Sequence, residues 1–452
     1  MNRRAAKLIS LLAFAVWLGP TAWAAPRLAV ESFQAAWEII RDTHWDTNYN
    51  GHNWEAVRSE FLPKVKAARN EEEVRDAIQE MLDLLGHSHL KVIPGPGSFT
   101  EEKETAALAE STREKPRKVH EGGNGSIGIE VRALNDQIVV WRVERGSPAE
   151  KAGVAPGWIL KEIDGEPAVD ATALKLSGRQ RDFLLWHNAA GLLKGDVDEP
   201  CELLAETGAG EKRVSIERER EMGEPAKLGN LPAMMTRVET NLIRLPSEKT
   251  IGYLRFNLWM LPAIRVIDQF VDANRNSDAI IIDLRGNVGG IGGMVMGAAG
   301  HFVNERSSLG KMKMRDNELN FIAFPRRVDS KMHPTNTFQG KLAILVDGIS
   351  LSSTELFAGA MQEMGRARVF GEQTGGQALP AVSDRLPNGD LLYHAVADFN
   401  TPKGRRLEGK GVTPDEVVPL RLEALRAGKD EVLTAALRWI DSAPQQGSTG
   451  VK

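Results

Sequence analysis

The sequence predicts an α+β protein of several domains: an N-terminal helical domain, a small β domain, and an α/β layered core. Three observations predict this order. Apolar residues recur with helical spacing in the first hundred residues, they form short alternating runs through the middle of the chain, and later strand-length runs alternate with helical segments. A length of 452 residues is enough for two or three domains.

The composition excludes several classes of function. The net charge of −4 is small, so no nucleic-acid partner is indicated. Cys201 is the only cysteine, which excludes an intrachain disulfide framework and a thiolate zinc cluster. We expect Cys201 to be a buried thiol, and we expect neither a metal site nor a cofactor.

Residues 1–24 are predicted to be a signal peptide. A basic start with Arg3 and Arg4 precedes an apolar run over 8–18, and Ala22-Trp23-Ala24 offers a cleavage site. The apolar run is short for a membrane span, and no later stretch is long enough, so no stable membrane insertion is expected. Secretion across the inner membrane into the periplasm is therefore predicted, with an uncleaved anchor as the alternative.

Residues 25–97 are predicted to form the helical domain. Apolar residues keep helical spacing over 33–40 and again over 74–85. Ser88 and His89 follow at the junction with a short strand, where a serine beside a histidine is as readily a surface pair as a catalytic one. The charged and polar residues 98–122 are predicted to be a linker.

Residues 123–220 are predicted to form the β domain. Its strands, its Gly-Ser-Pro-Ala turn at 146–149 and its strand end at 160–165 follow the order of a PDZ domain, which it resembles. A PDZ domain adds a peptide as a strand and captures its C-terminal carboxylate with backbone N–H groups. The resemblance implies a peptide-binding loop at Ser126, Ile127, Gly128 and Ile129. The alternative is a β domain used only as a spacer.

Residues 221–443 are predicted to form the α/β core, and residues 444–452 a disordered tail. A buried strand over 279–285 is followed by a glycine-rich turn at 286–293 and then by a helix, the arrangement that brings ligands to the ends of strands. The turn lacks a following Lys-Ser/Thr pair, which disfavours phosphate binding. Contact with a substrate oxygen and a plain tight turn both remain open.

The stretch 341–377 contains the candidate nucleophile. An apolar strand ends at Asp347-Gly348, a helix begins near Leu356, and Ser352 lies between them. A serine there has its hydroxyl at a helix N-terminus, where free N–H groups and the positive end of the helix dipole stabilise an oxyanion. Ser352-x-x-Glu355 also fits a capping box, which requires no chemistry. These residues alone leave both interpretations open.

Four segments of the core occur in the order found in the carboxy-terminal processing (tail-specific) serine peptidases and their tricorn-like relatives, which the chain resembles. The matching segments are 283–290, 350–360, 371–376 and 409–415. The resemblance implies a serine endopeptidase with Ser352 as the nucleophile, without metal or cofactor, that acts on polypeptides with free C-termini. The alternative is a non-proteolytic peptide- or ligand-binding protein on a degenerate peptidase scaffold. The oligomeric state is left unassigned.

The position of the usual base raises a difficulty. Gln377 stands where the tail-specific branch carries a lysine, and an uncharged amide cannot take a proton from a serine. The tricorn-like branch instead uses a serine-histidine pair and a glutamate, which Ser88, His89 and Glu408 match. The resemblance therefore implies His89 as the general base, with Ser88 and Glu408 fixing its orientation.

The remaining site residues are predicted less directly. The backbone N–H groups of Ser353 and Gly289 are expected to form the oxyanion hole, with the donating glycine left open. His394 is a competing base, although a histidine in a strand is more often structural. Glu363 occupies the position of an acidic helper in the lysine-type branch, and we expect it on a solvated helix face.

Overall fold

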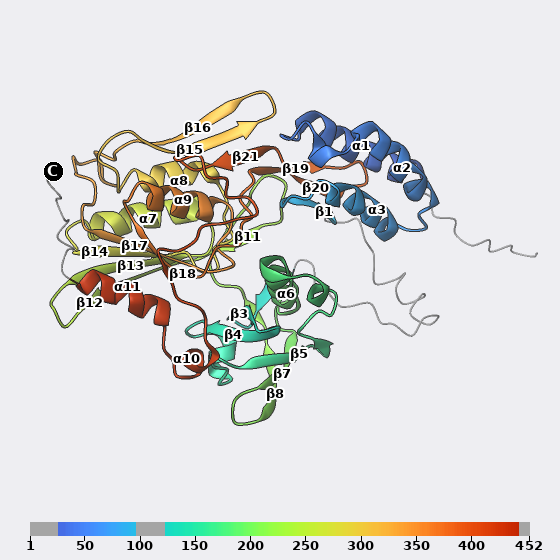
Figure 1. Cartoon of the computed structure of the whole chain (residues 1–452). Coiled ribbons are helices and arrows are strands. Elements are labelled where there is room, and N and C mark those ends of the chain that lie inside the picture. The colour runs from blue at the N-terminus through green and yellow to red at the C-terminus, as the bar shows by residue number, and fades with distance from the viewer. Residues whose placement is uncertain (1–25, 96–122, 443–452) are drawn as a thin grey trace, which may run out of the picture.

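The structure, a computed structural model, describes residues 26–95 and 123–442. It consists of an N-terminal helical unit, a β-rich unit and a larger core (Figure 1). The α+β class and the order of the units predicted from the sequence are confirmed. The predicted signal peptide at 1–24, the linker at 98–122 and the tail at 444–452 lie outside the described residues.

The N-terminal unit is a bundle of three helices whose apolar faces meet. They are α1 (Pro26–Thr43), α2 (Trp54–Ala67) and α3 (Glu71–Asp83), with a 3-10 turn η1 (Tyr49–Gly51) between the first two. Asn53 and Asn70 cap α2 and α3, because their side chains accept backbone N–H groups of the first turns. Strand β1 (Leu90–Ile93) leaves the bundle and pairs antiparallel with β20 (Leu391–Ala395) of the core.

The β-rich unit is an antiparallel sheet with the strand order β3-β4-β5-β7-β8, covered by helix α6 (Gly178–Leu192). The sheet strands are β3 (Ile129–Leu134), β4 (Gln137–Val143), β5 (Ile159–Ile163), β6 (Glu166–Pro167, paired with β5), β7 (Pro200–Glu206) and β8 (Glu211–Glu217), with α5 (Pro148–Lys151) and η2 (Ala173–Lys175) between them. Cys201 is buried here, as predicted, and burial raises the pKa of its thiol to about 12.

The core is built on a six-stranded sheet with the order β12-β13-β14-β17-β18-β22. Only β12 is antiparallel to its neighbour. The strands are β12 (Val238–Arg244), β13 (Thr250–Phe256), β14 (Ala279–Asp283), β17 (Lys341–Val346), β18 (Arg368–Gly371) and β22 (Glu416–Val417). Helices α7 (Leu261–Ala273), α8 (Gly292–Ala299) and α9 (Ser353–Glu363) cover one face, and α11 (Glu431–Asp441) covers the other.

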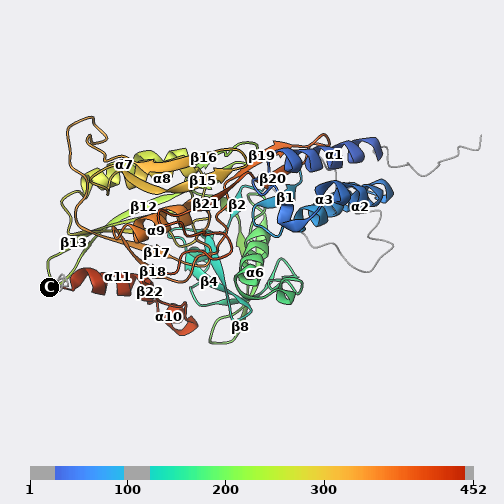
Figure 2. The same ribbon diagram turned by 45° about the horizontal axis from the view of Figure 1, so that its top comes forward.

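Smaller sheets complete the structure, and the one that contains β1 and β20 joins the N-terminal unit to the core. One has the order β16-β15-β21 and a second has the order β1-β20-β19, and two short pairs, β2-β9 and β10-β11, flank the β-rich unit. Their bounds are β2 (Gly125–Ser126), β9 (Glu219–Arg220), β10 (Glu224–Ala226), β11 (Met234–Thr236), β15 (Ser307–Met314), β16 (Glu318–Ala323), β19 (Ala381–Arg385) and β21 (Ala397–Asn400). Figure 2 shows α10 (Leu422–Arg426) and α11 together at the lower edge of the core.

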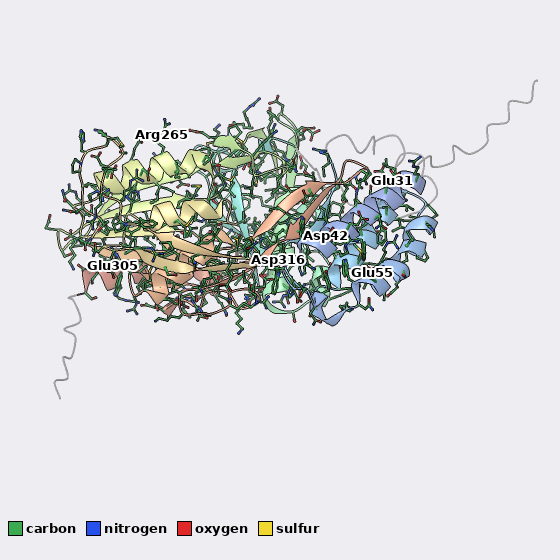
Figure 3. All side chains as sticks on the ribbon, turned by 90° about the horizontal axis from the view of Figure 1, so that it is seen from above. Glu31, Asp42, Glu55, Arg265, Glu305 and Asp316 are labelled. Atoms are coloured by element: carbon green, nitrogen blue, oxygen red, sulfur yellow. The ribbon has the colours of Figure 1, made fainter. Side chains whose placement is uncertain are left out.

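Charged side chains lie on the outer surfaces of the units. Glu31 and Asp42 project from α1, and Arg265 projects from α7 (Figure 3). Exposed ion pairs such as Arg27–Glu31, at 2.8 Å, contribute little to stability. No helix in the part of the chain that the structure describes is long and apolar enough to cross a bilayer.

The parallel strands position two loops side by side. Because β14 and β17 are neighbours in the sheet, the segments that follow them leave the same edge. The first segment is the glycine-rich turn after Asp283, and the second leads to Ser352. This edge of the sheet is therefore where the core can assemble a site.

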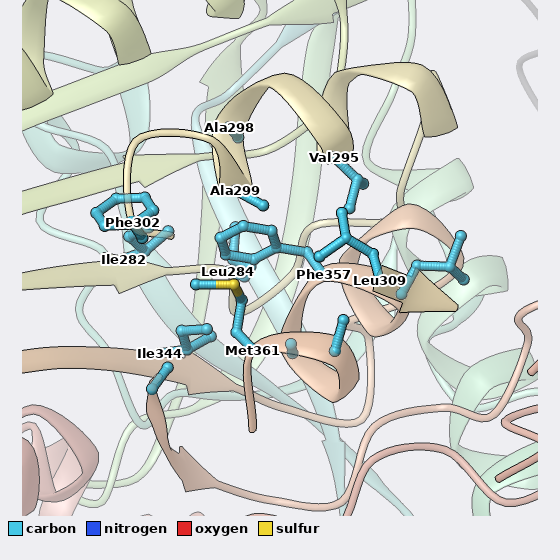
Figure 4. Close-up of a cluster of buried hydrophobic side chains, with 14 of the residues drawn as sticks. Ile282, Leu284, Val295, Ala298, Ala299, Phe302, Leu309, Ile344, Phe357 and Met361 are labelled. Carbon is cyan, nitrogen blue, oxygen red and sulfur yellow. The ribbon is translucent and has the colours of Figure 1, made fainter. Parts of the chain in front are cut away.

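Phe357 of α9 is a packing centre of the core. Its fully buried ring lies near Leu284, Ala299 and Met361 and is 5.2 Å from the ring of Trp259 (Figure 4). We expect Phe357→Ala to lower the free energy of unfolding by about 3–5 kcal/mol, because a cavity would remain. Urea denaturation would measure the change. Phe324→Ala is the control, since Phe324 is 64% exposed and its loss should change stability by less than about 0.5 kcal/mol.

Candidate active site

Ser352 lies at a sharp turn between β17 and α9. Its φ of 53° and ψ of −121° differ from the extended backbone that capping serines usually adopt. The predicted capping box is nevertheless present, with Glu355 Oε2 accepting the Ser352 N–H at 3.1 Å. A non-glycine residue in this strained region persists only where its surroundings hold it, which is typical of functional sites. Helix capping alone does not account for this conformation.

The glycine-rich turn lies in close contact with Ser352. A Cβ atom added to Gly289 would lie 2.7 Å from Ser352 Cβ and 3.2 Å from Ser352 Oγ, which is too close for any side chain at this position. Gly289 also has a φ of +97°, which favours glycine. The turn therefore needs glycine to bring its backbone to the serine hydroxyl.

The buried carboxylate of Glu355 connects the serine to a second turn. It accepts hydrogen bonds from Thr374 Oγ1 at 2.5 Å, from the N–H of Gly376 at 2.8 Å, from the N–H of Gln377 at 3.0 Å, and from Ser352. Burial raises the pKa of Glu355 to about 7, and these donors oppose that rise because they favour the charged form. Sequence reasoning missed the role of Thr374, although its turn belongs to a matched segment.

Ser88, His89 and Glu408 form a hydrogen-bonded chain. Ser88 Oγ lies 2.6 Å from His89 Nδ1 and 3.1 Å from Glu408 Oε2, and the Ser88 N–H donates to Glu408 Oε1 at 2.9 Å. A hydroxyl has one hydrogen and a carboxylate only accepts, so Ser88 donates to Glu408 and accepts from His89 Nδ1. This assigns the proton of the neutral imidazole to Nδ1 and leaves a lone pair on Nε2. An imidazole in this tautomer can act as a base.

The surroundings of His89 keep it neutral. Burial lowers the pKa of His89 to about 4, although the residue retains partial solvent exposure. The centroid of its ring lies 5.5 Å from that of the Tyr393 ring. Its φ of +57° makes His89 the second residue of this site, after Ser352, that is not glycine and has a positive φ. A neutral histidine is what a general base requires at neutral pH.

Glu408 links the two halves of the site. Besides Ser88 it accepts the Ala378 N–H at 2.9 Å, and Ala378 follows the turn that Glu355 holds. The structure thus brings Ser88, His89 and Glu408 together and connects them through this turn to Ser352. No hydrogen bond joins the His89 ring to the Ser352 hydroxyl among the described residues.

The two backbone N–H groups predicted to form the oxyanion hole differ in whether they already have an acceptor. The Ser353 N–H has no hydrogen-bond acceptor within residues 26–95 and 123–442, so it is free for a substrate oxygen. The Gly289 N–H donates to Asn287 Oδ1 at 3.0 Å. An oxyanion at Gly289 would therefore compete with the Asn287 side chain for that hydrogen.

Three other residues discussed above have structural contacts. The Gln377 carbonyl accepts the Ser352 N–H at 2.8 Å, so this position supports the serine through its backbone. His394 is buried, with its ring nitrogens next to Asp384 at 2.8 Å and Thr43 at 3.4 Å, which makes it structural. The expectation for Glu363 was wrong. Its side chain is only 10% exposed, because the segment 401–405 binds it through Thr401, the Lys403 N–H and Arg405.

The predicted peptide-binding loop of the β-rich unit is tightly bent. Gly128 has a φ of +77° and gives its N–H to Ser126 Oγ at 3.1 Å. The Ile127 side chain is buried in the core of the unit, so only its backbone could meet a peptide. Ile129 begins β3 and pairs with Val143. Peptide binding by these residues stays a prediction.

Two family profiles match the chain. Residues 250–418 match the profile described as peptidase family S41, and residues 30–83 match the one described as the tricorn protease C1 domain. The core of the chain is therefore a peptidase family S41 domain. The first match contains Ser352, Glu355 and Glu408, and the second ends shortly before Ser88.

Known relatives agree with this membership. A probable CtpA-like serine protease of Staphylococcus aureus (strain N315) is 25% identical over 313 residues, which is 68% of this chain and 56% of the relative. The corresponding protein of Staphylococcus haemolyticus (strain JCSC1435) is 24% identical over 310 residues, covering 67% and 55%. The chain thus spans little more than half the length of these relatives.

Two solved structures share the fold of this chain. The photosystem II D1 C-terminal processing protease superposes with a TM-score of 0.57 at 22% identity, covering 92% of this chain and 97% of that one. Mature CPAF gives a TM-score of 0.58 at 12% identity, covering 92% and 96%. At these identities the likeness shows the fold alone.

We expect Glu355→Gln to slow covalent labelling of Ser352 by a fluorophosphonate about 10- to 100-fold. The N–H₂ group of the glutamine would face hydrogen-bond donors such as Thr374 and the Gly376 N–H, and it could not accept from them. The rate is read by intact mass. Glu363→Gln is the matched control, since it makes the same change later in α9, and its rate should stay within about threefold. An equal loss of labelling rate in both variants would mean that the Glu355 contacts have no particular effect on the reactivity of Ser352.

The low pKa of His89 predicts that the labelling rate falls only at an unusually low pH. Protonation of Nε2 removes the base, and because burial lowers this pKa to about 4, the basic form persists well below the usual histidine range. Burial also raises the pKa of Glu355 to about 7, so labelling of the native protein should change once near pH 7 and fall a second time only below about pH 5. His89→Asn should abolish most labelling at every pH. A fall near pH 6.5 that persists in Glu355→Gln would contradict the burial argument for His89.

Proposed function

We propose that this protein is a serine endopeptidase that cleaves polypeptides by acyl transfer at Ser352, with His89 as the general base. The Glu408–Ser88–His89 chain carries the proposal, because it leaves a lone pair on Nε2 of a neutral imidazole. This base also answers the difficulty raised by Gln377, since no lysine is then needed. The strained backbone of Ser352 supports its role as the nucleophile.

Each proton has a place to go in this mechanism. As Ser352 Oγ attacks the scissile carbonyl carbon, His89 Nε2 takes the hydroxyl proton, and the Ser353 N–H donates to the oxyanion. The tetrahedral intermediate then collapses, the C–N bond breaks, and His89 returns the proton to the leaving amine. Water attacks the acyl-enzyme by the same route in reverse. Glu408 stabilises the transient imidazolium through Ser88.

We further propose that the β-rich unit is PDZ-like and recognises substrate C-termini. Its position supports this role, because two of its arginines contact the loops of the site. Arg179 of α6 donates to the Gly409 carbonyl at 2.7 Å, next to Glu408, and Arg132 of β3 binds Asp347 at 2.8 Å. A peptide held by this unit would be close to the nucleophile.

We also propose a periplasmic location, which the basic and apolar N-terminal sequence supports.

Turnover of an unfolded protein substrate such as reduced casein tests the activity. Ser352→Ala should lower cleavage by a factor of roughly 1,000 or more. Ser353→Ala is the control, because it keeps its backbone N–H and loses only a hydroxyl that donates to the Gly290 carbonyl. Its rate should stay within about tenfold of the native protein.

The same assay distinguishes C-terminal recognition. A peptide with a free carboxylate should be cleaved about 10-fold or more faster than its C-terminal amide, since the amide loses charge-assisted hydrogen bonds. Equal rates would remove the proposed recognition but keep the peptidase. If the native protein binds peptides yet cleaves none of them and resists fluorophosphonate, it is a binding protein on a degenerate scaffold.

A further inference from the structure

The three-stranded sheet β1-β20-β19 has two faces with different surroundings. On one face, Leu90 and Leu392 pack into the hydrophobic core of the N-terminal bundle. Because side chains alternate along a strand, Lys91 and Tyr393 lie on the opposite face and point away from the bundle. Burial lowers the pKa of His187 of α6, and the Lys91 ammonium lowers it further, so this opposite face lies near α6 (Figure 2).

Tyr393 places an unpaired donor beside the general base. The centroid of its ring lies 5.5 Å from that of the His89 ring. Tyr393 is half-buried, and its hydroxyl has no hydrogen-bond partner among the described residues. Burial raises the pKa of Tyr393 to about 12, so the hydroxyl keeps its proton at neutral pH and can donate it in a hydrogen bond.

The length of the tyrosine side chain limits which substrate groups can reach its hydroxyl. A phenol oxygen lies about 3 Å from its own ring centroid, so that of Tyr393 is within about 9 Å of the His89 ring centroid. An extended peptide advances about 3.3 Å per residue. The hydroxyl can therefore meet a substrate group about one to three residues from the scissile bond.

Lys91 supplies a second donor on the same face. It is paired with Tyr393 in the ladder between β1 and β20, which places the two side chains next to each other. Lys91 is exposed and has no ion pair within residues 26–95 and 123–442. An ammonium group can only donate, so the group that completes this pair must offer acceptors.

The surroundings of the pair favour a negatively charged group. No acidic residue shares this face of the sheet, whose other described members are Ile93, Ala381, Ser383, Arg385, Leu391 and Ala395. Asp384 lies on the opposite face of β19, where it binds His394. Asp182, the only acidic residue of α6, pairs with Arg181, and Glu408 accepts three hydrogen bonds from groups of the site. These acidic groups thus already have partners, whereas the two donors do not.

We propose that Lys91 and Tyr393 form a subsite that binds a carboxylate of the polypeptide substrate, within about three residues of the scissile bond. The carboxylate belongs to an aspartate or glutamate side chain, or to a C-terminus that lies equally close to the bond. The Lys91 ammonium pairs with it and the Tyr393 hydroxyl donates to it, so both residues determine specificity. The inference rests on the function proposed above, because the subsite is located relative to His89 as the general base.

Peptide binding to the Ser352→Ala protein tests the subsite without requiring turnover. The probes are two fluorescein-labelled nonapeptides of otherwise uncharged sequence, one with a central glutamate and one with glutamine in its place. Both end in a C-terminal amide, which removes capture of a C-terminal carboxylate by the β-rich unit. By fluorescence anisotropy, the glutamate peptide should bind about 10-fold or more tightly than the glutamine peptide. Equal affinities would overturn the proposal.

Variants made in the same Ser352→Ala protein assign the preference to this pair. Lys91→Gln should bring the two affinities to within about twofold of each other, and Lys91→Glu should favour a peptide with a central lysine. Tyr393→Phe should reduce the preference about threefold or more, because only the hydroxyl is lost. Lys161→Gln is the control, since Lys161 is an exposed lysine on β5. An undiminished preference for glutamate in folded Lys91 variants would overturn the assignment.

A third peptide distinguishes the two sources of the carboxylate. It is the glutamine peptide with a free C-terminus in place of the amide. A gain in affinity over the amide that disappears in Lys91→Gln would show that a C-terminus can occupy the pair. A gain that persists in Lys91→Gln comes from capture elsewhere, and a Lys91-dependent glutamate preference would then assign the subsite to acidic side chains.

Cleavage by the native protein separates this inference from the proposed function. The kcat/KM of the glutamate peptide should exceed that of the glutamine peptide by about 10-fold or more. Cleavage of both peptides at equal kcat/KM would overturn the subsite and keep the peptidase. Absence of cleavage, together with a Lys91-dependent preference in binding, would overturn the peptidase and keep the carboxylate-binding pair.

Discussion

The buried carboxylate of Glu355 is the interaction on which the whole candidate site depends. It binds the backbone of Ser352 on one side and the turn from Thr374 to Gln377 on the other. Ala378, which follows that turn, donates to Glu408, and Glu408 in turn holds Ser88. Helix α9 is thus connected to the histidine of the N-terminal unit by hydrogen bonds on either side of the peptide bond between Gln377 and Ala378.

The second constraint is the direction of the strands. Since β14 and β17 run parallel as neighbours, the glycine-rich turn and the serine turn must meet at one edge, and Gly289 is the residue that permits the contact. The β-rich unit reaches the same edge through Arg132 and Asp347. Asp347, a core residue, also accepts the Gly286 N–H at 2.9 Å, so one carboxylate connects Arg132 of the β-rich unit to the base of the glycine-rich turn.

The sequence was informative where local chemistry decides the structure. The strands around 279–285 and 341–346, the helix after Ser352 and the N-terminal helices follow from periodicity and caps. A capping serine and a nucleophilic serine need the same residue at the same place, so only the backbone angles could favour one. The contacts of Glu363 and the tautomer of His89 depend on partners distant along the chain, such as Glu408, which lies 320 residues from Ser88. Periodicity carries no signal for such pairs.

The pairing of β1 with β20 has a consequence for shortened forms of the protein. This four-residue strand helps to hold the histidine's unit against the core, together with contacts such as that of Arg75 with Asp390. The serine, its glycine-rich turn and the β-rich unit all come later in the chain. A product of internal initiation or proteolysis that started after Ile93 would keep every surface for holding a polypeptide but would have no group to accept its nucleophile's proton. Under the function proposed above, such a fragment would compete with the intact protein for the same polypeptides and protect them from cleavage.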